Sequence, residues 1–559
     1  MPPRVPVVSA AVPLALGLAT LVAQGASGPV LVSDEIAYLG IGVDLSTRAA
    51  TVQLAELEFY SPGYGFVLAP LLSLLPGDPW AIAVGVNLAC LALVGPLLFL
   101  LLREVLDIGR RRATLAATVA ACTPSVVLQV PRAWPELLLA VVLAAWALLL
   151  ARFVAGRHPA YGLAAAAAAG AALTVHRRAV VVVAVTALAV VHVHVRELRR
   201  CRAGPSADAA AGSWPGRAAA AWLAGTLGLV AAHLLANRAL DQAVKDRLYA
   251  GGDLVNANER AAELAGGDVL PRVVGHGWST LHASFGLVLL GLVGALVLLW
   301  RRPHRPFALA LAVVTGGAVV VSAVAVADGP RVDHLLYERY VAPIAVIGVA
   351  IGLGLLLDER RRVPLAAALA LPAGTAAVLL AIPSERLEGN VQKLTVPAIA
   401  SLEHLHRLSS SRFLDHLSPL RTGAVVLVVA VGLLLARRLG PPVASAAVLA
   451  AFAGVAIGGS LLGLRPFLDV WEPYGAVVAD AIRDDGHDGE PVGATPGAPE
   501  PIRAVVQHRL DYPKVVEVEG AACPQVVHVV AEPAFDPPWP AERLAVSELP
   551  DAVVYRVRC

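Results

Sequence analysis

The feature that most constrains this chain is a series of apolar runs about 20 residues long, the length of helix that crosses the ~30 Å hydrocarbon core of a bilayer. Hydrophobic residues make up 57% of the 559 positions and charged residues 15%, against roughly 45–50% and 25% in soluble domains. A single soluble core cannot hide that much apolar surface. The composition therefore excludes a soluble globular protein and predicts an all-α polytopic membrane protein.

Hydrophobic windows, read against breaks at proline, glycine and charged residues, predict about 13 transmembrane helices. They fall near residues 5–24, 80–102, 113–131, 135–154, 160–175, 178–195, 217–236, 279–300, 307–327, 340–357, 364–382, 421–436 and 442–463.

Arginines are concentrated in one alternating set of connections between these runs, for example at 110–112 and 360–362. Lysine and arginine near span ends are retained on the cytoplasmic side, which places the N-terminus in the cytoplasm. The opposite connections are then extracytoplasmic, and they include a long first outer loop, residues 25–79. The localisation that follows is the cell membrane.

We therefore expect a transmembrane domain over residues 1–464 and an extracytoplasmic domain over 465–559. The second is predicted to be a small α/β domain, because a helical stretch from Tyr474 to Arg483 precedes short β-rich runs at 515–518, 526–530 and 552–557. The net charge of +2 offers no basic field for nucleic acid, so the expected surroundings are membrane lipids.

The five cysteines have no metal-ligand spacing, so no metal site is predicted. Cys523 and Cys559 both fall in the outer domain, where an oxidising compartment permits a disulfide. We expect that these two cysteines pair.

The first outer loop carries the acidic dipeptide Asp34-Glu35, followed by Tyr38. Apolar spacing after it predicts an amphipathic helix in the membrane interface with Ser33 as N-cap. Two interpretations remain open. The carboxylates could simply favour the helix dipole, or one of them could accept a proton from a hydroxyl that arrives from the aqueous side.

A second segment of this loop contains Tyr60 and Tyr64 and continues as an apolar run to Leu75, which is too short to span a bilayer. Irregular backbone at membrane depth is tolerated where it is buried in protein or lines a water-filled cavity. The segment is therefore either part of a site or a plain helix–turn–helix corner.

Cationic residues also occur at outer helix ends, against the positive-inside tendency. They lie beside Glu136 at the start of the fourth span, in the turn between the fifth and sixth spans, and beside Tyr340 at the tenth span. The residues are Arg132, His176, Arg177, Arg178 and Arg339. Carboxylates, lipid head groups or a bound phosphate could compensate their charge. For a single arginine, snorkelling or pairing with Glu136 or Glu338 is the preferred explanation, and several such residues together are more informative.

Taken in order, these segments resemble the GT-C superfamily of polyprenyl-phosphate-dependent membrane glycosyltransferases, especially bacterial relatives of the protein O-mannosyltransferase and aminoarabinose-transferase type. The segments that carry the resemblance are Asp34-Glu35 with Tyr38, residues 60–64, residues 134–138, an arginine between spans five and six, and residues 338–340.

The resemblance implies a GT-C-like fold and an inverting glycosyltransferase, a hexosyl- or pentosyltransferase, that uses a polyprenyl-phosphate sugar donor. The acceptor is then a cell-envelope glycan, lipid or protein. By position, Asp34 looks like the catalytic residue with Glu35 as its neighbour, and the donor phosphate lies against basic residues, for which Arg177, Arg178 and Arg339 are candidates. Which of Arg177 and Arg178 faces the site stays open.

The same resemblance makes Tyr38, Tyr60, Tyr64, Glu136, His176 and Tyr340 candidate substrate-binding residues. No cofactor is required for a monophosphate leaving group, so a divalent metal is optional. Two other classes are kept. A transporter or flippase for an anionic or lipid-linked substrate predicts charged or broken helices near the bilayer midplane, and a membrane scaffold leaves the acidic loop unexplained.

Overall fold

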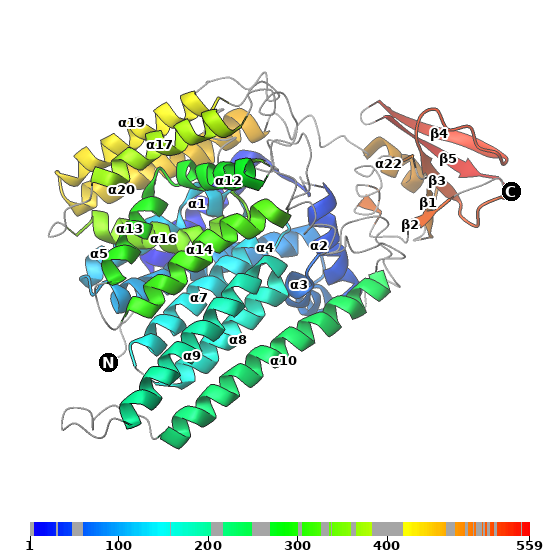
Figure 1. Cartoon of the computed structure of the whole chain (residues 1–559). Helices are drawn as coiled ribbons and strands as arrows, with labels where there is room; N and C mark the ends of the chain where they lie inside the picture. The colour runs from blue at the N-terminus through cyan, green and yellow to red at the C-terminus, as the bar shows by residue number, and fades with distance from the viewer. Residues whose placement is uncertain are drawn as a thin grey trace.

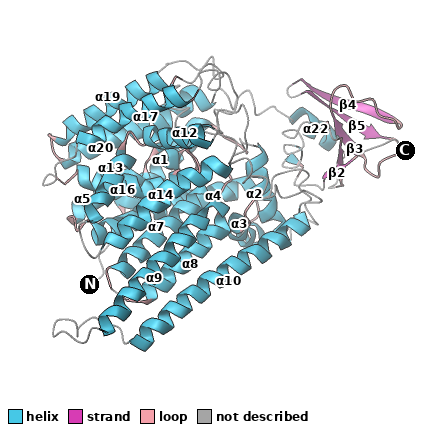
Figure 2. Ribbon diagram, viewed as in Figure 1, coloured by secondary structure: helices cyan, strands magenta, loops and turns pink. Residues whose placement is uncertain are grey.

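The protein is described by a computed structural model in which a large helical part lies beside a small C-terminal sheet (Figures 1 and 2). The described residues of the helical part are 5–29, 32–46, 60–156, 158–202, 216–248, 269–299, 304–325, 335–336, 338–358, 365–382 and 418–465. Those of the C-terminal part are 476–486, 490–495, 497–498, 506, 509–510, 515–518, 522–548 and 551–558.

Most of the apolar runs form helices close to the predicted bounds. The helices of this part are α1 (Val8–Gln24), α2 (Val32–Leu45), α3 (Gly63–Leu74), α4 (Pro79–Val105), α5 (Arg110–Ala121), α6 (Pro124–Val127), α7 (Glu136–Val154), α8 (Ala160–Val175), η1 (Arg177–Ala179), α9 (Val180–Arg202), α10 (Gly216–Leu248), α12 (Val269–Ala283), α13 (Leu287–Leu299), α14 (Arg305–Ala325), α16 (Ala342–Leu356), α17 (Leu365–Ala381), α19 (Pro419–Arg437), α20 (Pro441–Ala453), and the π-helical turns η6 (Gly454–Gly458) and η7 (Ser460–Leu464).

Two predicted spans are interrupted. The run at 113–131 divides into α5 and the single turn α6, where Pro124 follows Thr123 and begins a new helix. The run at 279–300 is bent by 102° between α12 and α13, where Phe285 (φ +50°) and Gly286 (φ +77°) adopt left-handed backbone. Hydropathy misses both breaks because the breaking residues lie within apolar sequence.

Among the described residues, seven helices are long and apolar enough to cross a membrane, or eight if α12 and α13 count as one bent span. Several predicted spans form shorter apolar helices, including α1, α8 and α16. The general prediction of a multi-spanning helical protein is therefore confirmed, whereas the count of 13 stays a prediction.

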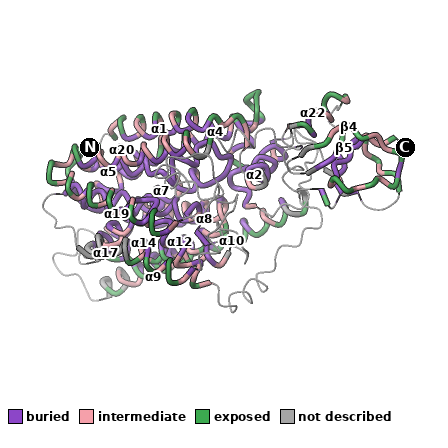
Figure 3. The backbone as a smooth tube through the Cα atoms, turned by 90° about the horizontal axis from the view of Figure 1, so that it is seen from above, coloured by how far each residue is buried: buried purple, intermediate pink, exposed green. Residues whose placement is uncertain are grey.

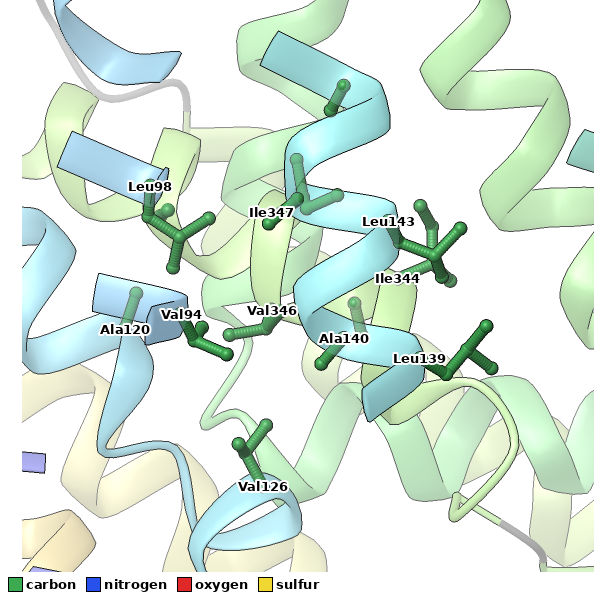
Figure 4. Packing of buried hydrophobic residues seen from close by; sticks show 14 of the residues in the cluster. Val94, Leu98, Ala120, Val126, Leu139, Ala140, Leu143, Ile344, Val346 and Ile347 are labelled. Carbon is green, nitrogen blue, oxygen red and sulfur yellow. The ribbon is translucent and has the colours of Figure 1, made fainter. Parts of the chain in front are cut away.

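The centre of the helical part is α16, all of whose residues are buried. A helix that is apolar all round is expected to be buried, and α16 packs against α13, α7 and α5. Figure 4 shows Ile344 of α16 beside Leu143 of α7, and Val346 of α16 beside Val94 of α4. The segment that carries Arg339 enters this helix, so its position is fixed by the core.

Glycines let the helices around α16 approach closely. A Cβ at Gly291 of α13 would lie 1.9 Å from the carbonyl oxygen of Gly348, and one at Gly352 would lie 2.3 Å from that of Leu287. Such small residues are typical of tightly packed membrane helices.

The helix predicted at the acidic dipeptide exists as α2, but it is not half-exposed at an interface. Residues 35–44 are all buried (Figure 3), and α2 packs mainly against α3. The amphipathic interpretation is wrong because residues on every face of α2 are buried, with α3 as the main neighbour. The helix begins at Val32, so Ser33 lies in its first turn and is not an N-cap.

The C-terminal part is a five-stranded sheet of order β2-β1-β3-β5-β4. Parallel pairing joins β1 (Val492–Ala494) to β2 (Val515–Glu517) and to β3 (His528–Ala531), and β4 (Ala541–Glu548) and β5 (Asp551–Val557) form an antiparallel pair. The helix α22 (Ala476–Asp484) packs on β4 and β5. The predicted helix and three predicted strands are present, and β1 and β4 are additional.

Cys523 is disulfide-bonded, and Cys90 and Cys122 are free and buried. Cys559 lies outside the described residues. The pairing of Cys523 with Cys559 therefore stays a prediction.

Candidate active site

Arg339 connects two carboxylates that come from distant parts of the chain. Its Nη1 donates to Asp34 Oδ2 and its Nε donates to Glu136 Oε1. The Arg339 side chain is 1% exposed and that of Glu136 is 2% exposed, whereas Asp34 is 23% exposed. Asp34 is thus the carboxylate of this group that solvent or a substrate can reach.

Trp134 has two guanidinium groups near its ring. Arg339 is 3.5 Å from the centroid of its ring and Arg132 is 6.0 Å from it. Arg132 is fully buried with Glu35, and the shortest distance between them is 4.0 Å, from Nη1 to Oε1. Glu35 also accepts a hydrogen bond of 2.9 Å from the backbone N–H of Ala133. The two adjacent acidic residues therefore have different arginine partners.

Tyr60 contacts the partly exposed carboxylate and belongs to a cluster of three tyrosines. The Tyr60 hydroxyl donates to Asp34 Oδ1 at 2.7 Å. The ring of Tyr38 meets those of Tyr60 and Tyr64 edge-on, at centroid distances of 5.0 and 6.1 Å. Burial raises the pKa of the Tyr38 phenol well above its usual value, and the Glu136 carboxylate acts in the same direction.

Tyr64 is buried and donates to the side chain of Asn87, at 3.0 Å. Asn87 in turn donates to the carbonyl oxygen of Arg132. Tyr64 therefore supports the segment that precedes α7, and its hydroxyl is occupied by protein.

Arg178 and Tyr340 form the other side of the cluster. The guanidinium of Arg178 lies 3.1 Å from the centroid of the Tyr340 ring, and its Nη1 is buried without a hydrogen-bond partner among the described residues. His176 meets the same ring edge-on at 5.3 Å. Burial lowers the pKa of His176 well below its usual value, and Arg178 and Arg339 add to the effect.

Arg177 has a different environment from Arg178. Its side chain is 41% exposed and pairs with Asp241 of α10 at 3.3 Å, while its backbone N–H donates to the Ser61 hydroxyl. Of the two adjacent arginines, Arg178 is therefore the one that lies against the cluster.

The predicted site residues thus gather at one end of the helical part. Arg339 precedes α16, and Asp358, which follows α16, pairs with Arg112 at 3.4 Å. The 15 residues of α16 separate these two ion pairs by ~22 Å. Figure 1 shows α2 and α3 at the end nearest the C-terminal sheet, away from the N-terminus.

The structure places four further residues in contact with the cluster: Asn87, Arg132, Trp134 and Asp241. The sequence indicated Arg132 only as one of the cations at helix ends and Trp134 only as part of a matching segment, and it gave no indication of the other two. The position of Arg132 and Trp134 just before a span that begins with Glu136 was the available signal. Asn87 lies within an apolar run and Asp241 within a long helix, so only packing identifies them.

No group of three or more histidine, cysteine, aspartate or glutamate side chains within the described ranges is arranged to hold a metal ion.

Comparison with known proteins adds the fold family. Residues 60–207 match the family described as dolichyl-phosphate-mannose-protein mannosyltransferase. The structure of ArnT from Cupriavidus metallidurans bound to undecaprenyl phosphate is similar, with a TM-score of 0.55, 15% identity and coverage of 98% of this chain and 97% of that chain. The chain has the GT-C fold.

The apo structure of the same ArnT gives a TM-score of 0.53 at 16% identity and covers 96% of this chain and 95% of that chain. No curated protein matches the sequence. The resemblance to GT-C glycosyltransferases that the sequence indicates is confirmed by these matches, and the GT-C fold together with the apolar helices makes this a multi-pass membrane protein.

Proposed function

We propose that the protein is an inverting glycosyltransferase that moves a sugar from a polyprenyl-phosphate donor to an extracytoplasmic cell-envelope acceptor. The observation that carries the proposal is the environment of Asp34. It is the partly exposed carboxylate of a buried cluster and is oriented by Tyr60 and Arg339. A base that is fixed in this way can accept a proton from a hydroxyl that approaches from water.

In the proposed reaction the acceptor oxygen attacks the anomeric carbon of the sugar while Asp34 takes the proton of the hydroxyl. The bond from the anomeric carbon to the phosphate oxygen breaks, and the electron pair leaves with the polyprenyl phosphate. A single displacement of this kind inverts the anomeric configuration. Glu35 is buried against Arg132 and Ala133, so it acts beside the base and does not meet the acceptor.

Arg178 is the arginine best suited to the donor phosphate. It has a buried nitrogen without a hydrogen-bond partner among the described residues, whereas Arg339 already donates to two carboxylates and Arg177 pairs with Asp241. A fixed guanidinium stabilises the charge that develops on a leaving phosphate. Because the leaving group is a monophosphate, a divalent metal is optional in this mechanism.

Charge placement supports an extracytoplasmic site. Arg112 of α5 and Arg437 of α19, from two of the arginine-rich connections, both contact Asp358. The cluster around Asp34 lies at the other end of α16. If the positive-inside tendency holds, Asp34 and the domain that begins at residue 465 are outside the cytoplasm.

One observation favours a second candidate, a transporter or flippase. The bend between α12 and α13 is the kind of broken helix that such proteins use to bind substrates. A transporter would move a lipid-linked sugar across the bilayer without cleaving it.

The test is sugar transfer by purified protein in lipid, with undecaprenyl-phosphate hexoses and pentoses as donors and release of undecaprenyl phosphate as the readout. Asp34→Asn keeps an acceptor for the Tyr60 hydroxyl and should lower turnover by about 10²–10⁴-fold. Asp358→Asn, an ion-paired carboxylate at the opposite end of α16, is the matched control and should retain activity. Full activity of Asp34→Asn would contradict the assignment of Asp34 as the base. Movement of intact donor across vesicle membranes without cleavage would support the transporter function.

A further inference from the structure

Arg132 is a buried cation that pairs with Glu35, although its three guanidinium nitrogens make no hydrogen bond to the described residues. Its side chain is 0% exposed. The nearest carboxylate is Glu35, at 4.0 Å. Taking both charges out of water is costly, and removing either partner leaves an uncompensated charge. A pair retained at this cost requires an explanation.

Glu35 is anchored at a second point. Its Oε2 accepts the backbone N–H of Ala133 at 2.9 Å, which joins α2 to the segment that leads into α7. Arg339 bridges a residue close to each of these two, namely Asp34, which precedes Glu35 on α2, and Glu136, three positions after Ala133 at the start of α7. The Glu35 contacts therefore fix the two segments that carry Asp34 and Glu136, the carboxylates that Arg339 bridges.

Trp134 is a neighbour of both ion pairs. Arg339 lies 3.5 Å from the indole centroid and Arg132 lies 6.0 Å from it. The pair of Asp34 with Arg339 and the pair of Glu35 with Arg132 therefore lie beside the same ring.

We propose that Glu35 and Arg132 form a positioning clamp, in which the pair fixes Asp34 toward Arg339 and each partner cancels the charge that the other would place near the base. The inference rests on the proposed function of Asp34 and deepens it. Neither Glu35 nor Arg132 contacts substrate in this scheme; both act through Asp34.

The charged and titratable groups around Asp34 determine what the clamp can change. Arg339 and Tyr60 bond to Asp34 directly, and Glu136 shares Arg339 with it. Tyr38 stacks edge-on against Tyr60. These neighbours are the same in a clamp variant, so a change in the pH dependence of turnover reports the clamp charges.

The test is a double-mutant cycle on the full-length protein in lipid, with kcat/KM measured against pH. Glu35→Gln leaves the Arg132 charge uncompensated. That positive charge favours ionised Asp34 and lowers its pKa, so the acidic limb of the profile of kcat/KM against pH should move to lower pH. Arg132→Gln removes the positive charge that pairs with Glu35 and should move the acidic limb of the pH profile to higher pH. A unit charge about 10 Å away, at an effective dielectric constant of about 20, shifts a pKa by about one unit.

The Glu35→Gln/Arg132→Gln double variant should return the limb to the wild-type position. Asp358→Asn should not move it, because Asp358 lies at the opposite end of α16. Single variants that lose activity without opposite shifts would overturn the proposal and assign the pair a purely structural role.

If wild-type protein transfers no sugar, the proposed function fails, and the clamp is tested separately by thermal unfolding in detergent. A clamp predicts that the double variant loses less Tm than the sum of the two single variants. Additive losses would overturn it whatever the activity.

Discussion

Arg339 and Asp34 are separated by 305 positions in the sequence and share a hydrogen bond in the folded protein. The same guanidinium bonds to Glu136 and stacks on Trp134. One arginine therefore orients the proposed base, neutralises a buried carboxylate and packs against an aromatic ring.

Arg339→Lys should lower transfer strongly although it conserves charge. An ammonium group lacks the planar fork that reaches two carboxylates from separate nitrogens, and it does not stack on the indole in the same way. We expect at least a 10-fold loss of kcat, and about 3–5 kcal/mol of destabilisation for Arg339→Met, which leaves buried Glu136 without its partner. Transfer assays and thermal unfolding measure the two effects. Wild-type turnover in Arg339→Lys would contradict the geometric role.

Arg178→Ala should weaken donor binding more than Arg177→Ala. A hydrogen bond to a charged group contributes about 1.5–3 kcal/mol, so Arg178→Ala should raise the Kd for undecaprenyl phosphate by about 10–150-fold. Arg177 is 41% exposed and engaged with Asp241, and it serves as the adjacent control. Binding to protein in nanodiscs checks the order, and a larger effect at Arg177 would reverse the assignment.

His176 should make the protein less stable in acid. Burial lowers its pKa in the folded protein, whereas the unfolded chain titrates near 6.5. Below about pH 6.5 the unfolded state then binds the extra proton, so stability falls as pH falls, by up to about 1.4 kcal/mol per pH unit. The Tm of wild type should drop more between pH 7.5 and 5.5 than that of His176→Asn. Parallel pH profiles of Tm would show that His176 does not carry this effect.

Gly95→Ala should disrupt the packing of α1 on α4. An added Cβ would lie 1.8 Å from the Ser9 carbonyl oxygen, and overpacking of this kind costs about 1–3 kcal/mol. Gly85, on the same helix, has nothing within 4 Å of such a Cβ, so Gly85→Ala is the matched control and should not destabilise. Equal Tm values for the two variants would contradict the close contact.

The C-terminal domain should lose stability when its disulfide is reduced. Cys523 is disulfide-bonded, and a loop closed between Cys523 and Cys559 contributes about 3–4 kcal/mol in the chain-entropy model. Thiol labelling of intact cells, before and after reductant, tests both the pairing and its side of the membrane. Labelling of Cys559 before reduction, with Cys523 protected, would exclude this pairing.

The class of protein and the order of its segments could be predicted from the sequence because they depend on local composition. Apolar length predicts helices such as α4 and α7 within a few residues. The breaks at Pro124 and Phe285 and the burial of α2 were not predictable, because they depend on what packs against each segment.

Most residues of the candidate site, although not Asn87 or Asp241, could also be selected from the sequence, since cationic residues at the predicted outer helix ends run against the positive-inside tendency. The interaction partners of these residues could not be predicted from the sequence. The sequence left Arg339 open to a phosphate or a carboxylate, and the fold pairs it with Asp34 and Glu136.

What the sequence determined by itself is therefore the membrane setting, the approximate helices and the end of each helix at which charge occurs, since these follow from hydropathy and charge along the chain. Only the tertiary structure decided that Arg178 faces the cluster while Arg177 turns to Asp241, and that Glu35 belongs to Arg132. Adjacent residues differ in this way because an ion pair forms only where helices distant in the sequence bring opposite charges close together. The spatial distance between those charges is set by the packing of the whole core.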